Sequence, residues 1–366
     1  RTSETKIALG SSAGETTQGV SAVAIGNDAG KTTQGTYAVA VGYRAGNITQ
    51  GSEAVAIGVD AGKTDQGASA VAIGGWAGET SQGIAAVAIG ENAGTTAQGA
   101  GSVAVGPIAG QTNQGAEAVA IGDAAGVLTQ GTNAVAVGYQ AGNITQGSEA
   151  VAVGVYAGKT DQGASAVAIG NEAGKTDQGA SAVAIGNEAG ETSQGTQAVA
   201  VGDQAGKTNQ AVRATAIGAY AGQTTQGDDT VAIGSYAGQT NQAVNGVAIG
   251  AGAGSDTQGI RSVAVGAGAG YIRQGEDAVA VGYTAGRNDQ GANAIAIGRL
   301  AGETNQAARS IILNATNSAL DTTQEDSLII KPIRDAVGTT MLMYDVTSGE
   351  VTHTASPAIT GDITGS

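Results

Sequence analysis

Residues 22–37 read AVAIGNDAGKTTQGTY, and this pattern returns every sixteen residues along most of the chain. Glycine stands at each of the nineteen positions spaced by sixteen residues from Gly10 to Gly298, without an insertion or a deletion. The alanine three residues after each of these glycines, the glycine four residues after and the glutamine eight residues after are equally constant. A period this strict indicates a stack of identical structural units.

Each unit is too short for a pair of helices, and its Val-Ala-Ile run bounded by glycine is typical of a short strand. If each unit forms one turn, equivalent residues lie above one another at a spacing of about 4.8 Å. Nineteen turns then make a rod of roughly 90 Å. The sequence therefore predicts an all-β protein, a parallel β-solenoid of sixteen-residue turns.

The composition agrees with a thin, regular core. The 366 residues include 63 glycines but no Phe and no Cys, and hydrophobic residues reach 41% while aromatic residues are only 3%. Three prolines are too few for collagen. The net charge of −15 argues against a nucleic-acid partner. Because no stretch of 18 apolar residues occurs, we expect no membrane insertion.

Both faces of the expected strands are apolar. Val23 and Ile25 point to one side, whereas Ala22 and Ala24 point to the other. A lone solenoid needs only one buried face, so the alanine face suggests close packing against another chain, as in three copies that meet along an axis. The sequence leaves open which face fills the turn and which lines the axis.

The constant glycines are expected at corners that need positive φ or close backbone approach. The glutamine column is expected to form an amide ladder in which each side chain bonds to its neighbours one turn above and below. The first six members of this column are Gln18, Gln34, Gln50, Gln66, Gln82 and Gln98.

The repeated A-V-A-I-G core resembles the head repeat of YadA-like trimeric adhesins over residues 6–313. This resemblance implies a left-handed parallel β-roll assembled as a homotrimer. The sixteen-residue turn is longer than the usual head unit. Neither the neck motif nor the heptad stalk and membrane anchor of the bacterial proteins is found.

The period fades after residues 311–314, which divides the chain into a rod (1–314), a connector (315–326), a small strand and hairpin segment (327–354) and a flexible tail (355–366). The I-I-L-N-A-T run, the K-P-I-R strand and the hairpin around Val346–Gly349 resemble segments of virion fibre proteins of large DNA viruses and tailed phages. This likeness implies a place on the virion surface, with other virion proteins at the chain ends.

The sequence offers no catalytic constellation. Its single histidine, His353, lies in the predicted hairpin and is expected to be a surface strand residue. Asp65 and Asp161 share one repeat column with Ser, Asn and Thr, which favours a solvated face over a metal ladder. Residues 250–254 (GAGAG) follow the repeat and open no helix, so they are not a phosphate loop. We predict no enzyme activity, cofactor or metal.

Seven of the ten aromatic residues occupy the two variable positions after the first glycine, on one corner of the solenoid. Such rings either cover the corner or stack on the sugar rings of a host glycan. These residues are Tyr43, Trp76, Tyr139, Tyr156, Tyr220, Tyr236 and Tyr283.

Three functions fit these features. The first is a structural and adhesive trimeric fibre that projects from a virion and attaches to a host surface by many weak contacts, or serves as a spacer. The second is the head of a bacterial trimeric adhesin. The third is an ice-binding solenoid, because thirteen turns place Thr two residues before Gln, although Ile48, Leu128, Ile144 and Ile272 interrupt that file.

Overall fold

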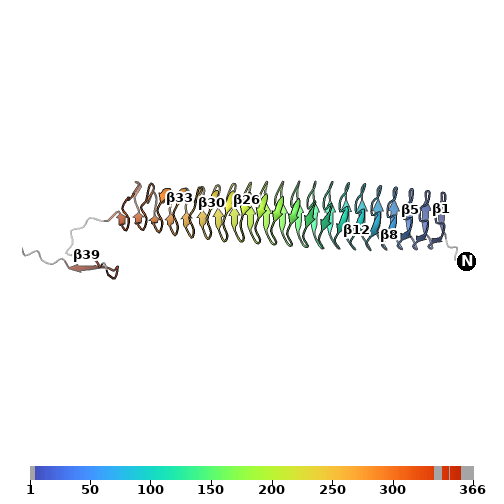
Figure 1. Ribbon diagram of the computed structural model, residues 1–366, viewed down its shortest axis with the longest axis horizontal. Helices are drawn as coiled ribbons and strands as arrows, with labels where there is room; N and C mark the ends of the chain where they lie inside the picture. Colours follow the sequence, from blue (N-terminus) through green and yellow to red (C-terminus); the bar gives the residue numbers. More distant parts are fainter. Residues whose placement is uncertain (1–4, 334–339, 346, 356–366) are drawn as a thin grey trace, which may run out of the picture.

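The computed structural model describes residues 5–333, 340–345 and 347–355. It shows a long rod of stacked solenoid turns, each built from short β-strands (Figure 1). The described residues contain strands and turns but no helix. Equivalent strands of successive turns pair in parallel with a sixteen-residue offset, as in Val23↔Val39 and Ala24↔Ala40. The predicted all-β parallel solenoid is therefore confirmed.

The first sheet contains one strand from every turn. Its 21 strands are β1 (Ile7–Leu9), β3 (Val23–Ile25), β5 (Val39–Val41), β7 (Val55–Ile57), β9 (Val71–Ile73), β11 (Val87–Ile89), β13 (Val103–Val105), β15 (Val119–Ile121), β17 (Val135–Val137), β19 (Val151–Val153), β21 (Val167–Ile169), β23 (Val183–Ile185), β25 (Val199–Val201), β27 (Thr215–Ile217), β29 (Val231–Ile233), β31 (Val247–Ile249), β32 (Val263–Val265), β34 (Val279–Val281), β36 (Ile295–Ile297), β37 (Ile311–Asn314) and β38 (Leu328–Lys331).

The second sheet forms the opposite wall around the glutamine column. Its strands are β2 (Thr17–Gln18), β4 (Thr33–Gln34), β6 (Thr49–Gln50), β8 (Thr64–Gln66), β10 (Thr80–Gln82), β12 (Thr96–Gln98), β14 (Thr112–Gln114), β16 (Thr129–Gln130), β18 (Thr145–Gln146), β20 (Thr160–Gln162), β22 (Thr176–Gln178), β24 (Thr192–Gln194), β26 (Thr208–Gln210), β28 (Thr224–Gln226) and β30 (Thr240–Gln242). Single bridges at Gln258 join it to the pair β33 (Ile272–Gln274) and β35 (Asn288–Gln290).

The alanine face fills the interior of each turn. Ala22, Ala24 and Ala29 have no exposed surface in a single chain, whereas Ile25 is 37% exposed. The expectation that the alanine columns pack against another chain is therefore wrong. Each turn encloses these methyl groups between its two short strands.

The first glycine of each unit lies where successive turns touch. Gly26 has φ +129°, and a Cβ built on it would lie 2.4 Å from the carbonyl oxygen of Gly42 in the next turn. An L-residue is strained at this φ whatever the space around it. This contact explains why glycine recurs without exception in that column.

The residue before each constant glutamine has two backbone conformations. It lies in the left-handed region at Asp65 (φ 53°) and Asn113 (φ 53°), but it stays extended at Thr33 in β4. Thr225 is the one threonine of this column with left-handed φ, at 51°. A β-branched residue is disfavoured there, whereas Asn is tolerated.

Replacing Thr225 by Asn is therefore expected to stabilise the rod by about 1 kcal/mol, because the strain of a β-branched residue at positive φ is removed. The midpoint of chemical unfolding would measure the gain. The matched change Thr33→Asn should give none, because Thr33 is already extended. An equal gain at both positions would contradict this assignment of strain.

The rod continues past the boundary that we set at residue 314. β38 pairs in parallel with β37, with Ile311 opposite Leu328, so the predicted connector is one more turn that is one residue longer. Leu320 and Ile312 enter the core where earlier turns have alanine. The backbone N–H of Gly302 donates to the carbonyl of Leu320 at 2.8 Å.

The predicted hairpin is an antiparallel pair of strands, β39 (Thr340–Tyr344) and β40 (Val351–Ala355). His353 lies in β40, opposite Leu342. The backbone N–H groups of Thr347 and Ser348 donate to the Asp345 carboxylate, which closes the turn and lowers the pKa of that group. The predicted tail lies outside the described residues from position 356 onward.

Candidate functional site

The first and third residues of the first-sheet strands from β3 to β36 point outward and form one apolar surface, here called the Val/Ile face. All are Val or Ile except Thr215. The isoleucines at the third position are well exposed, at 37% for Ile25, 40% for Ile121 and 43% for Ile297, whereas valines such as Val41 and Val105 are half-buried there. The first residues are half-buried. From β3 to β36 a single chain thus presents an apolar stripe without a charged residue.

The seven aromatic residues singled out in the sequence lie on the corner that follows the first sheet, but they form separate groups. Tyr43, Trp76 and Tyr283 are 46%, 40% and 54% exposed. Arg44 lies 4.8 Å from the Tyr43 ring centroid, in cation–π geometry.

The other four aromatic residues make two pairs. Tyr139 and Tyr156 meet edge to face with centroids 5.3 Å apart, and Tyr220 and Tyr236 stack at 5.0 Å with nearly parallel planes. Loss of hydration, together with the neighbouring Tyr139, raises the pKa of the Tyr156 hydroxyl. These rings partly cover one another, which leaves less of each face open to a ligand.

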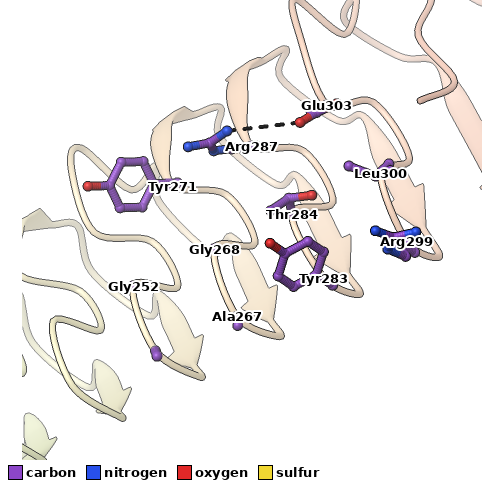
Figure 2. Close-up of a pocket in the computed structure, with 11 residues that line it drawn as sticks. Gly252, Ala267, Gly268, Tyr271, Tyr283, Thr284, Arg287, Arg299, Leu300 and Glu303 are labelled. Carbon is purple, nitrogen blue, oxygen red and sulfur yellow. Dashed lines mark ion pairs between the residues drawn. The ribbon is translucent and has the colours of Figure 1, made fainter. Parts of the chain in front are cut away.

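A cleft of about 520 Å³ hollows the same corner over the turns that contain residues 251–303 (Figure 2). Tyr271 and Tyr283 line it together with Arg287, Arg299 and Thr284. The remaining lining residues are Ala251, Gly252, Ala267, Gly268, Leu300 and Glu303.

Tyr271 is not among the aromatic residues predicted from the sequence, because it follows the second glycine of its unit rather than the first. The available signal was the pair of small residues at positions 251–252 and again at 267–268, where other turns have larger side chains.

Ion pairs link successive turns along the rod. Arg213 donates two hydrogen bonds to Asp229 at 2.6 Å, and Arg261 donates two to Asp277 at 2.7 Å. The bonds from Arg261 lower the pKa of the Asp277 carboxyl. Because these groups are exposed, each pair contributes little to stability. Each pair nevertheless places a positive side chain of one turn beside a negative side chain of the next.

The glutamine column lies inside the rod, with Gln34, Gln66 and Gln98 at most 3% exposed. Gln34 donates to the Val23 carbonyl at 2.8 Å and to the Gln50 side-chain oxygen at 3.1 Å. The same contacts recur along the stack, so these side chains connect the second sheet to the first sheet and also link successive turns. They are not accessible to a ligand.

Gln130→Glu tests the buried ladder. Gln130 is 2% exposed, accepts from Gln114 at 3.1 Å and donates to Gln146 at 3.0 Å. Burial raises the pKa of a carboxyl, so the folded variant holds its proton more tightly than the unfolded chain. Stability should stay close to wild type below pH ~4 and fall by about 3 kcal/mol as the pH rises to 7.

Denaturant unfolding at pH 3.5 and pH 7 measures this difference. Gln197→Glu is the matched control, because Gln197 is exposed in a column that contains Glu149 in another turn. It should unfold like the wild type at both pH values. A Gln130→Glu chain with no pH dependence beyond that of the control would contradict the ladder.

The outer face of the second sheet carries the row of threonines that lie two residues before the constant glutamines. Ile48 and Leu128 interrupt it and are 42% and 47% exposed. The backbone of the adjacent column is left-handed over the runs 65–113 and 161–241 but not at Thr17, Thr33, Thr49, Thr129 and Thr145, so this face changes its conformation along the rod. The row of threonines is therefore divided into shorter runs and is not continuous along the rod.

Among the described residues, no cluster of three or more His, Asp or Glu side chains is placed to hold a metal ion. Within the same residues, no helix is long and apolar enough to cross a membrane. No family model, curated protein or solved structure matches the chain significantly.

Proposed function

We propose that this chain is the shaft of a virion fibre, in which three copies pack along a shared axis through their Val/Ile faces. The rod projects from the particle and meets a host surface through weak contacts repeated along its length. The particle surface, and hence the extracellular side, is its place of action.

The Val/Ile face, in which Thr215 is the single exception, is the observation that carries this proposal. An exposed apolar patch larger than a few hundred Å² usually marks an interaction site. The face extends over strands of three residues in the eighteen turns from β3 to β36, which corresponds to roughly 850 Å². A stable interface buries about 800 Å² per partner. A copy of the same chain has the same spacing between its turns, so its side chains match this face over the full length.

The exposed aromatic corner supports an adhesive role. Tyr43, Trp76 and Tyr283 stand on a polar rod and offer flat faces that sugar rings stack against. Repetition along a rigid trimer turns weak individual contacts into avidity. The net charge of −15 makes nucleic acid a poor partner.

Immunogold labelling tests the location. Antibodies raised against the purified rod should decorate filaments that project from intact particles, viewed by negative-stain electron microscopy. Labelling of a bacterial cell surface, with particles left bare, would reject the virion fibre in favour of a cellular adhesin.

A further inference from the structure

The cleft exists because two successive turns lack side chains at one corner position. The second residue after the first glycine has left-handed φ throughout the rod, and other turns fill it with non-glycine residues such as Gln140 (φ 52°) and Gln204 (φ 52°). Gly252 and Gly268 have the similar values of 64° and 67°. The backbone therefore does not require glycine at these two positions. Because glycine has no side chain, the corner stays empty there.

Two tyrosines stand beside this space. Gly268 lies between Tyr271 and Tyr283 in Figure 2. A Cβ built on Gly252 would touch the Tyr271 ring at 3.4 Å, so the ring lies directly over that glycine. Tyr283 is 54% exposed. The cleft volume of about 520 Å³ lies in the range of small-molecule sites.

Two guanidinium groups give the cleft a positive charge on an acidic rod. Arg287 approaches Glu303 only at 3.9 Å, and Arg299 reaches the uncharged Asn317 at 3.3–3.4 Å. Arg213 and Arg261, by contrast, are each held by two short bonds to a carboxylate. The arginines of the cleft therefore keep hydrogen-bonding capacity for an anion.

Thr284 presents its methyl group to the hollow, 3.3 Å from a Cβ built on Gly268. Thr284 is 7% exposed, and within the described residues its side-chain oxygen has no hydrogen-bond partner. A buried polar atom without a partner costs about 1–3 kcal/mol. Because that oxygen is buried, Thr284 contributes an apolar methyl surface beside Tyr283 to the cleft.

We propose that this cleft binds an acidic saccharide unit, a pyranose ring that carries a carboxylate. The ring stacks on the tyrosines, and the carboxylate accepts hydrogen bonds from Arg287 and Arg299. This inference rests on the adhesive part of the proposed function and narrows its ligand class to glycans that contain acidic sugars.

Methyl glucuronide and methyl glucoside test the proposal, because they differ only in the carboxylate. Saturation-transfer NMR with the full chain should show millimolar binding of the glucuronide and at least tenfold weaker binding of the glucoside. Acetate, as a free carboxylate, should compete poorly. Equal binding of both sugars, no binding of either, or acetate that competes as well as the glucuronide would each overturn the proposal.

Two variants locate the binding. Gly268→Gln places in the hollow a residue that the same backbone already carries at Gln140 and Gln204, and Arg299→Gln removes one charge. Each should weaken glucuronide binding at least tenfold. Arg213→Gln, with the same loss of charge outside the cleft, should leave binding unchanged. Full binding by Gly268→Gln, with an unaltered circular dichroism spectrum, would overturn the site.

Light scattering on the same samples measures the mass of the assembly, so it tests the trimer independently of sugar binding by the cleft. A trimer that binds neither sugar rejects the cleft and leaves the trimeric rod standing. A monomer that binds the glucuronide rejects the trimer and supports the cleft.

Discussion

Gly138→Ala is expected to open the solenoid at one turn. Gly138 has φ +130°, and a Cβ there would lie 2.5 Å from the Gly154 carbonyl oxygen and 2.8 Å from its carbonyl carbon. Both atoms belong to the backbone of the next turn and cannot move without breaking the stack. Strain and overlap together should cost about 4 kcal/mol or more.

Because each turn contacts only its neighbours, this damage should stay local. Limited proteolysis should cut the variant within the turns around residue 138, and the midpoint of denaturant unfolding should fall. Gly75→Ala is the control, since its φ is not positive and a Cβ there has no atom within 4 Å. Equal resistance of wild type, Gly138→Ala and Gly75→Ala would contradict the close stacking of the turns.

A pair of glutamates on the Val/Ile face is expected to dissociate the assembly without unfolding the chain. Ile121 and Ile169 are 40% and 39% exposed in a single chain, so their replacement leaves the alanine core intact. In the trimer, three copies of each glutamate would meet near the axis, where like charges cost several kcal/mol. The association should weaken at least 100-fold.

Sedimentation velocity should then find the Ile121→Glu, Ile169→Glu double variant as a monomer with a wild-type circular dichroism spectrum. The matched control is the double variant Ile48→Glu, Leu128→Glu, because these side chains are 42% and 47% exposed on the second sheet instead. It should retain the wild-type mass. Dissociation of the control alone would place the interface on the second sheet.

The architecture follows from the sequence because a strict period leaves few alternatives. Sixteen residues without an insertion permit one small turn per unit, and constant glycine and glutamine columns imply direct stacking. The orientation of the strands was not predictable in the same way. Val23 and Ala24 are both apolar, and only the enclosed volume of the turn decides that alanine lies inside.

Two features, the last turn of the rod and the cleft, could not be predicted from the repeat unit because they depend on contacts between neighbouring turns. The turn through residues 315–331 has lost the constant glycine and glutamine, and Leu320 and Ile329 replace alanine in and around its core. The cleft depends on Tyr271 beside Gly268 of its own turn and Gly252 of the turn before, which no single unit reveals. The aromatic corner was visible as a column, whereas its division into separate pairs depends on side-chain packing.

The mass of the purified chain in solution tests the central claim most directly. Multi-angle light scattering over a range of micromolar concentrations should give a constant mass near three times the 35.0 kDa of one chain. A single chain, or a dimer, that persists over this range would contradict the three-fold packing of the Val/Ile face.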